Sequence, residues 1–498
     1  MRGGFTPRIA GRPSSELETR DLPNRLIVDL TRNQLLYRPV VEPGQQVAFG
    51  DPLAVVGAAG GTLALPAPAG GVIGRVADDE RSLTIESPAA AREAPSFSAQ
   101  RYEHISRAEI VEILARGGVW PLLWSSRTRS MPSLDDAAGP RSVVVNFVLT
   151  EPYRARGKVV INRSWQSIVQ GIRFLQRLLA DYGSVEIILT SPDDPVARMI
   201  AADLSGYAWV RIHAVPLVYP IENPRILTDL VRAARSRDAW VAPGRGESGR
   251  GAPGRDGRGA AAPSEDIWVV DAQGIAAVGA CLAEGLPLHE RIVVAGGPGR
   301  PDPKHYAVRI GTPLSHLFGE PERAGSGGGE RPLLLRGGLL NGLPADESTD
   351  SVGYDDDAYF FLPRAGRREP FGFIRPGFDR SSYNRSFATQ LTGGRDRHIT
   401  ASLRGERRAC IACGLCEKVC PAGIMPQVIH RYLYRGLIEE AEKAGLDRCV
   451  ECNLCTYVCP SKIELVEQFI HAKLEIQREK EEILAVEARS RGGEEEAT

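Results

Sequence analysis

Cysteine is almost absent from most of this sequence. The 498-residue chain contains nine cysteines, and only Cys281 occurs before residue 410. Cys281 lies in an apolar stretch, which predicts a small buried side chain and not a ligand. The opening MRGGFTPRIAGRPSS is polar and glycine-rich and lacks the apolar core of a signal peptide. These features argue against a secreted disulfide scaffold.

Net charge and long apolar runs are also lacking. The formal net charge is −1, so no broad basic field favours nucleic acid or an anionic membrane surface as a partner. No apolar run is long enough to span a bilayer, so a chain that serves a membrane must dock on partner subunits. No Walker A run is present, and no G-x-G-x-x-G follows an expected strand. The loop AGGPGRPDP is interpreted as a turn, with a cofactor cradle as the alternative.

The other eight cysteines fall in two matched C-x2-C-x2-C-x3-C-P runs, the pattern of bacterial ferredoxins. In two-cluster proteins the fourth cysteine of each run ligates the other cluster. The predicted ligands of the first 4Fe–4S cluster are Cys410, Cys413, Cys416 and Cys459. Those of the second cluster are Cys449, Cys452, Cys455 and Cys420. Zinc knuckles, the alternative, usually use two C-x2-C pairs without a third cysteine and a C-P.

The loops between the cysteines support this interpretation. Two intervening residues let a tight loop turn three thiolates towards one cluster, and the following proline stops the turn from continuing as helix. Ala412, Gly414 and Asn453 leave backbone N–H groups free to approach cluster sulfurs. Electron tunnelling requires no acid or base, so no catalytic residue is predicted. His430 is interpreted as a helix-surface residue.

The length of 498 residues predicts three or four domains, and the patterns along the chain predict a multidomain α+β protein. Residues 1–95 contain short alternating strands between glycine and proline turns, a pattern similar to the lipoyl-type barrel-sandwich hybrid. Lipoyl and biotin carriers place a lysine on an exposed hairpin, whereas this chain has GAAGGTLALP there. We therefore expect a structural module and not a swinging arm.

Strands and helices alternate over residues 96–300, which predicts a Rossmann-like α/β layer with a mainly parallel sheet. The expected strands lie in SVVVNFVLTEP, SVEIILTSP, WVRIHAVPLVYP, IWVVDAQG and RIVVAGGPG. Residues 242–264 are of low complexity and are expected to form a disordered insert.

The remaining sequence predicts four further segments. Residues 301–350 suit a small β-grasp module of the SLBB-like kind, and residues 351–400 form a connecting segment rich in Arg and aromatic residues. Residues 401–475 are the two-cluster ferredoxin domain, in which a helix or helix pair separates the cysteine runs. Residues 476–498 form a charged tail.

Several segments resemble two related families, the C subunit of Rnf-type complexes and the A subunit of the sodium-translocating NADH:quinone reductase. GGFTPRIAGRPS and FGFIRPGFDRSSYNRSF are similar to the reductase family. FVLTEPY at 147–153, VYP at 218–220 and both cysteine segments are similar to the Rnf family. The resemblance covers most of the chain, which looks intermediate between the two families.

The resemblance implies an electron-transfer subunit that lies in the cytoplasm, peripherally on the inner face of the cell membrane. Its two 4Fe–4S clusters relay electrons between a donor, on the NADH or ferredoxin side, and membrane redox subunits or quinone. The implied partners are other subunits of a membrane redox complex, with no nucleic acid and no transmembrane segment of its own.

Rnf-type C subunits carry a flavin/NADH loop of the GGAGFP kind, which we do not find here. FMN is therefore unsupported, whereas quinone stays a candidate ligand. Arg375, Arg380 and Arg385 are candidates to contact an anionic or quinone-like ligand, or else a partner subunit. Two other functions stay open: a catalytic subunit that reacts with NADH or quinone, and a ferredoxin-fused scaffold of a soluble electron-bifurcating complex.

Overall fold

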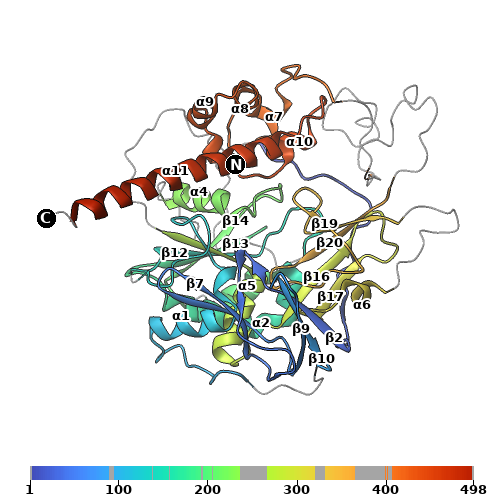
Figure 1. Ribbon diagram of the computed structural model, residues 1–498, viewed down its shortest axis with the longest axis vertical. Coiled ribbons are helices and arrows are strands. Elements are labelled where there is room, and N and C mark those ends of the chain that lie inside the picture. Colours follow the sequence, from blue (N-terminus) through green and yellow to red (C-terminus); the bar gives the residue numbers. More distant parts are fainter. Residues whose placement is uncertain are drawn as a thin grey trace.

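A computed structural model describes most of the chain (Figure 1). The described residues are 3–88, 95–136, 138–155, 157–191, 195–204, 206–235, 266–319, 331–364, 399, 401 and 407–495. The predicted disordered insert and the segment that holds Arg375, Arg380 and Arg385 lie outside these residues. The described part is a mixed α+β structure with several sheets and a C-terminal ferredoxin-type domain.

Short antiparallel strands form the N-terminal part. Two small sheets have the strand orders β2-β10-β9-β6 and β5-β7-β8, and β3 pairs with β4. The strands are β2 (Arg25–Asp29), β3 (Thr31–Arg32), β4 (Leu35–Leu36), β5 (Arg38–Pro39), β6 (Gln46–Val47), β7 (Pro52–Ala58), β8 (Gly61–Pro66), β9 (Gly71–Val76) and β10 (Ser82–Glu86).

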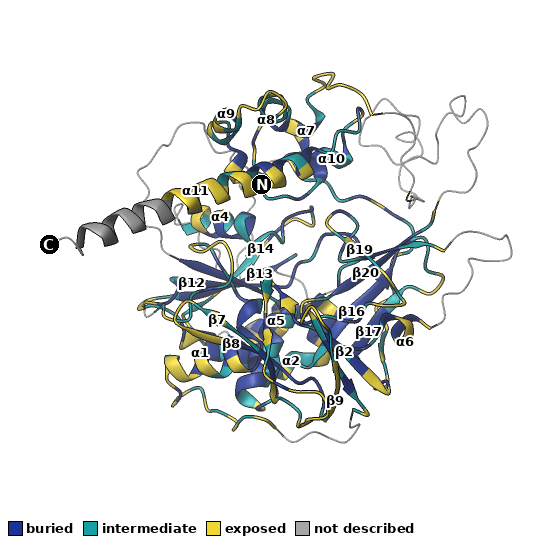
Figure 2. Cartoon of the chain, in the orientation of Figure 1, coloured by how far each residue is buried: buried dark blue, intermediate teal, exposed yellow. Residues whose placement is uncertain are grey.

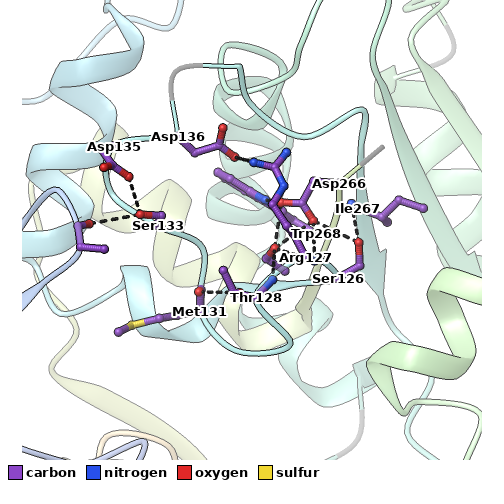
Figure 3. Close-up of polar contacts among 12 residues, drawn as sticks. Ser126, Arg127, Thr128, Met131, Ser133, Asp135, Asp136, Asp266, Ile267 and Trp268 are labelled. Carbon is purple, nitrogen blue, oxygen red and sulfur yellow. Dashed lines mark hydrogen bonds and ion pairs between the residues drawn. The ribbon is translucent and has the colours of Figure 1, made fainter. Parts of the chain in front are cut away.

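The tip of the β7–β8 hairpin is held down and does not project freely. Leu134 N donates to Ala59 O at 3.1 Å. Gly60 has φ +84°, and a Cβ atom there would lie 2.5 Å from the backbone nitrogen of Asp135. Asp135 belongs to the loop shown in Figure 3. A lysine-free hairpin in close contact with its neighbour fits a structural module.

A five-stranded sheet of order β11-β15-β12-β13-β14 forms the α/β layer. Its strands are β11 (Trp124–Ser125), β12 (Ser142–Asn146), β13 (Ser184–Leu189), β14 (Val210–Ala214) and β15 (Ile267–Asp271). Four of them are parallel, and only β11 is antiparallel. The strand–helix alternation predicts a mainly parallel sheet, which these four runs form.

Helices cover both faces of this sheet. They are α1 (Arg107–Arg116), α2 (Gly157–Gln176), α3 (Pro195–Leu204), α4 (Pro224–Arg235) and α5 (Ala272–Ala283), with the short 3-10 turn η1 (Trp120–Leu122). Val143 and Val145 pack with the core that includes α2, α3 and α5. Val144, between them, packs with α4. Successive residues of the strand face helices on opposite sides of the sheet. Both faces of the strand are therefore buried, and its sequence is apolar throughout.

A buried carboxylate fixes the edge of the α/β sheet (Figure 3). Asp266 accepts hydrogen bonds from the Ser125 and Ser126 hydroxyls, the Arg127 backbone nitrogen and the Trp268 indole, at 2.8 to 3.0 Å. A buried charge is costly without partners, so these donors make Asp266 a fixed anchor for the 125–130 loop.

A six-stranded sheet of order β1-β17-β16-β20-β18-β19 forms the third layer. Its strands are β1 (Leu17–Thr19), β16 (Glu290–Gly296), β17 (Lys304–Arg309), β18 (Leu333–Arg336), β19 (Leu343–Ala345) and β20 (Ala358–Leu362), with α6 (Leu314–Phe318) beside them. RIVVAGGPG was expected in the α/β layer, but β16 pairs with β17 and β20. Its apolar run is suited to either sheet, so the pattern alone could not decide.

The C-terminal helices lie above the other layers in Figure 1. They are α7 (Leu415–Val419), α8 (Pro426–Leu433), α9 (Ile438–Lys443), the 3-10 turn η3 (Leu446–Arg448), α10 (Leu454–Tyr457) and α11 (Leu465–Glu495). The expected helix pair between the cysteine runs is α8 and α9. Within the described ranges, no helix combines the length and apolar character needed to cross a membrane.

Helices α2 and α5 pack closely because glycines line their contact, which gives a direct test of the layer. A Cβ atom on Gly279 would lie 1.7 Å from Ser167 O, whereas one on Gly206 meets nothing within 4 Å. We expect Gly279→Ala to lower the free energy of unfolding by about 1–3 kcal/mol through overpacking. Gly206→Ala should change it by less than about 1 kcal/mol. Denaturant unfolding followed by tryptophan fluorescence measures both, and equal effects would contradict this packing.

Candidate metal centres

Two recesses in the ferredoxin-type domain each bring four cysteines together. The outer recess encloses about 350 Å³, including open solvent, and is otherwise lined mainly by apolar side chains such as Leu415 and Ile463. Its cysteines are Cys410, Cys413, Cys416 and Cys459. Three cysteines of the first run thus meet the fourth cysteine of the second.

The inner recess is the counterpart and encloses about 300 Å³, again including open solvent. Its cysteines are Cys420, Cys449, Cys452 and Cys455, with Val466 and Phe469 among the apolar residues around them. The two recesses therefore contain the two sets that the spacing predicted as ligands. That these cysteines hold clusters stays a prediction.

The two halves of the domain repeat one local structure. Each cysteine of the second run lies 39 positions after its counterpart, and the starts of α10 and α11 lie 39 positions after those of α7 and α8. Left-handed backbone recurs at the same offset, at Ala412, Gly414 and Gly423 and at Glu451, Asn453 and Lys462. Left-handed residues among right-handed ones turn successive N–H groups into one concavity, which suits an anionic cluster.

The two recesses differ in how far their cysteines are buried. Cys410 and Cys413 are exposed, and Cys459 is half-buried, whereas all four cysteines of the inner recess are buried. Burial raises the pKa of Cys416 to about 11 and that of Cys452 to about 12. Such thiols would release their protons to solvent when a cationic metal such as iron binds the thiolates.

The donor chemistry fits an iron–sulfur cluster. Four thiols in an apolar recess are the ligands that 4Fe–4S clusters use in ferredoxins. In the described part of the chain, no three or more His, Cys, Asp and Glu side chains are grouped so that they could hold a metal ion. Each set of four cysteines lines a recess, as a cluster of several atoms requires. When bound, such a cluster supplies one-electron redox chemistry, while these residues hold and shield it.

Three side chains from the α/β layer donate hydrogen bonds to residues 447–453, which we call the inner cysteine loop. The Tyr219 hydroxyl donates to Cys452 O at 2.8 Å. The Asn223 amide donates to Val450 O at 3.3 Å. Arg225, at the start of α4, donates to Asp447 O at 3.0 Å and to Cys449 O at 3.3 Å. The backbone carbonyls of this loop are thereby fixed from outside the ferredoxin-type domain.

The six-stranded sheet contributes a second contact to the same loop. Asn453 Nδ2 donates to Leu340 O at 2.8 Å. The Asn341 amide lies 2.8 Å from the Tyr219 hydroxyl and, with its oxygen and nitrogen exchanged, would also donate to Glu451 O at 3.1 Å. Tyr219 and Leu340 pack with Leu454 and other buried residues of the domain. The junction is therefore both polar and apolar.

The N-terminal segment passes through this junction. Phe5 N donates to Tyr219 O at 3.0 Å, and Tyr219 N donates to the Thr6 hydroxyl at 2.9 Å. The Phe5 ring stacks on Tyr457 of α10, with centroids 6.1 Å apart. Figure 1 shows the N-terminus beside the C-terminal helices. Phe5 and Thr6 thus contact both the α/β layer and α10 of the ferredoxin-type domain.

Buried acids lie beside the junction. Glu151 is 5% exposed and accepts from Leu340 N at 3.1 Å and from Asn341 N at 3.2 Å. Glu222 accepts from Glu151 N at 2.7 Å. Burial raises the pKa of Glu222. Burial alone would lower the pKa of Arg154, but the charges of Asp357 and Glu151 outweigh it and raise that pKa.

The sequence identified part of this junction. FVLTEPY contains Glu151, and VYP contains Tyr219, so two segments that carried the family resemblance meet here. Asn223, Arg225 and Glu222 were missed; the signal that could have pointed to them is their position just after VYP. His430 is half-buried, and its Nδ1 lies 2.7 Å from Gln468 Oε1, away from both recesses. Cys281 is fully buried, as predicted.

The fold and the two recesses define a class: a multidomain α+β protein with a C-terminal ferredoxin-type domain. Two family models match parts of the chain. The 4Fe-4S dicluster domain matches residues 402–464, and the NqrA second alpha/beta domain matches residues 105–214. The second match covers much of the α/β layer that carries the junction.

Curated relatives of this chain are named as the A subunit of the Na(+)-translocating NADH-quinone reductase. The protein of Tolumonas auensis is 24% identical, and the match covers 70% of each chain. Those of Pseudomonas aeruginosa and Hahella chejuensis are 23% and 24% identical, and each match covers 89% of this chain and 91% of the relative. The resemblance to that reductase family is thereby confirmed, as is the 4Fe–4S dicluster domain.

Solved structures of an NAD+-reducing [NiFe]-hydrogenase are also similar to parts of the chain. The air-oxidized form has a TM-score of 0.34 at 14% identity and is matched over 53% of this chain and 50% of the hydrogenase chain. The H2-reduced form has a TM-score of 0.40 at 13% identity, over 75% of this chain and 65% of the other. The present chain thus spans half to about two thirds of those chains.

The crossed arrangement of the cysteines can be tested by pairs of substitutions. Cys410→Ser with Cys459→Ser removes two thiols from one recess, so about four of about eight irons per chain should remain. Cys410→Ser with Cys420→Ser affects both recesses although both cysteines belong to one run, and little iron should remain. Iron and sulfide analysis after anaerobic purification measures this.

Cys281→Ala is the control for this test and should keep the full iron content. The opposite ranking of the two double variants would mean that each run serves its own cluster, and would contradict the crossed arrangement.

Proposed function

We propose that this protein is a peripheral electron-transfer subunit of an Rnf/Nqr-like membrane oxidoreductase. Two 4Fe–4S clusters relay single electrons between a donor, on the NADH or ferredoxin side, and membrane redox subunits or quinone. The observation that carries the proposal is the pair of four-cysteine recesses, each completed by a thiol from the other run. The ligands of the outer cluster are Cys410, Cys413, Cys416 and Cys459. Those of the inner cluster are Cys420, Cys449, Cys452 and Cys455.

The cysteines of the outer recess are more exposed than those of the inner recess, so the two clusters would meet different partners. Cys410, Ile411 and Cys413 are exposed on the outer side, and Ile411 is 65% exposed. The outer cluster is the one that a redox partner can approach closely, because little protein lies over these cysteines. The inner cluster exchanges electrons with the outer cluster and with a redox partner that binds near the α/β layer.

The domain arrangement of this subunit is part of the proposal. Residues 1–95 form a barrel-sandwich module, 96–300 a Rossmann-like α/β domain and 301–350 an SLBB-like β-grasp module. Residues 351–400 form the connecting segment rich in Arg and aromatic residues, 401–475 the ferredoxin domain and 476–498 a charged tail. The antiparallel N-terminal sheets and the parallel β12–β15 sheet support these units. β1, β16 and β20 extend the third sheet beyond 301–350.

We also propose where the protein acts, on the basis of its relatives and of cluster chemistry. Curated relatives are named as the A subunit of a Na(+)-translocating NADH-quinone reductase, which supports docking on other subunits of a membrane redox complex. Exposed thiolate clusters persist best in a reducing compartment. Both points support the proposal that the protein acts in the cytoplasm, against the inner face of the cell membrane.

A catalytic subunit that reacts directly with NADH or quinone is the second candidate. The name of the relatives, which includes both NADH and quinone, favours it. It requires an organic cofactor or substrate site in addition to the clusters. The α/β layer would supply such a site, and Glu151, Glu222 and Arg154 are polar groups of this layer that lie close to the junction.

Anaerobic purification of the chain alone separates the two candidates. For the relay we expect about eight irons per chain, with reduced-cluster EPR signals after dithionite and none after NADH. Reduction by NADH alone would instead favour the catalytic candidate. Zinc in place of iron after anaerobic reconstitution would contradict both, because neither works without a redox-active metal.

A further inference from the structure

Two cationic side chains meet on one backbone carbonyl of the inner cysteine loop. Cys449 O accepts from Lys473 Nζ at 2.6 Å and from Arg225 Nη1 at 3.3 Å. Lys473 belongs to α11 of the ferredoxin-type domain, whereas Arg225 belongs to α4 of the α/β layer. The carbonyl of Cys449 therefore lies between one cation from its own domain and one cation from the α/β layer.

In the described part of the first half of the repeat, the carbonyl of Cys410 has no equivalent pair of cations. Tyr434 precedes Lys473 by the 39-residue offset of the repeat, and its side chain is 85% exposed. Among the residues that the structure describes, no Arg or Lys side chain is hydrogen-bonded to Cys410 O. The pair of cations is thus specific to the inner loop and is not a requirement of the ferredoxin pattern itself.

We propose that Arg225 and Lys473 are positioning residues that raise the reduction potential of the inner cluster, an inference that rests on the proposed two-cluster relay. Reduction adds an electron to a cluster that already carries negative thiolates. Burial opposes this addition, and nearby positive charge favours it. The two cations offset the effect of burial, so that the inner cluster remains reducible although protein surrounds it.

The negative charge of Glu451 would lower the reduction potential of the inner cluster. Its carboxylate lies 2.6 Å from Lys473 Nζ, but the Glu451 side chain is 43% exposed whereas that of Lys473 is 19% exposed. Solvent screens the more exposed charge more strongly, so the net effect of the pair on the cluster is positive. Because Arg225 comes from α4, the potential also depends on docking of the α/β layer against the domain.

Redox titration followed by EPR, on the full anaerobic chain, tests the proposal. Lys473→Met and Arg225→Met should each shift the midpoint potential of the inner cluster to more negative values and leave the outer cluster unchanged. Cys410→Ser, which alters a ligand of the outer cluster, assigns the two signals. Lys473→Arg keeps the charge and should restore most of the potential.

Lys480→Met is the matched control. Lys480 lies on the same helix and is also paired with a glutamate, Glu442, at 2.6 Å. It lies seven residues beyond Lys473, about 10 Å further along the helix. Both midpoints should stay unchanged in this variant, because the same loss of charge occurs far from the inner loop.

Three outcomes separate the possibilities. An unchanged inner midpoint in iron-replete Lys473→Met and Arg225→Met, or an equal shift in Lys480→Met, would overturn the role of these cations and leave the relay intact. Absence of clusters from the unsubstituted chain would refute the relay itself. If Lys473→Met does not retain its inner cluster, Glu451→Gln decides: a shift to less negative potential supports the proposal, and no shift contradicts it.

Discussion

Each cysteine recess is completed by a thiol from the other half of the domain, and the rest of the structure depends on this exchange. Neither run can place four thiols around one recess, because its fourth cysteine lies across the domain in the other one. Helices α7 and α10 must therefore pack together before either recess is complete. This interlock fixes the domain as one unit, which can then be docked on the α/β layer as a rigid body.

Docking breaks the symmetry of the repeat. The two loops share their spacing and their left-handed residues, yet the first is exposed and the second is covered by Tyr219, Asn223 and Arg225. Figure 2 shows buried segments beneath the C-terminal helices, where this junction lies. Local sequence thus sets the shape of both loops, while tertiary contact sets their dielectric surroundings and the charges near them. Environment, more than ligand type, then distinguishes the two centres.

The sequence was informative where chemistry imposes spacing. The cysteine runs predicted which four residues share each recess, and the β-branched runs predicted the parallel strands β12 to β15. It could not predict that β16 leaves that layer, because an apolar run is compatible with either sheet. It also could not predict Arg225 or Lys473 at Cys449. The first contact depends on docking of the α/β layer, and the second on how α11 packs within the ferredoxin-type domain, and no local pattern encodes either.

The position of the inner loop on the α/β layer has a consequence for function. Glu151 and Tyr219 follow β12 and β14, so both lie at the carboxyl ends of parallel strands. Open α/β sheets bind their ligands at this edge. In this chain the inner cysteine loop docks at that edge, so a cluster held in the inner recess would lie beside it.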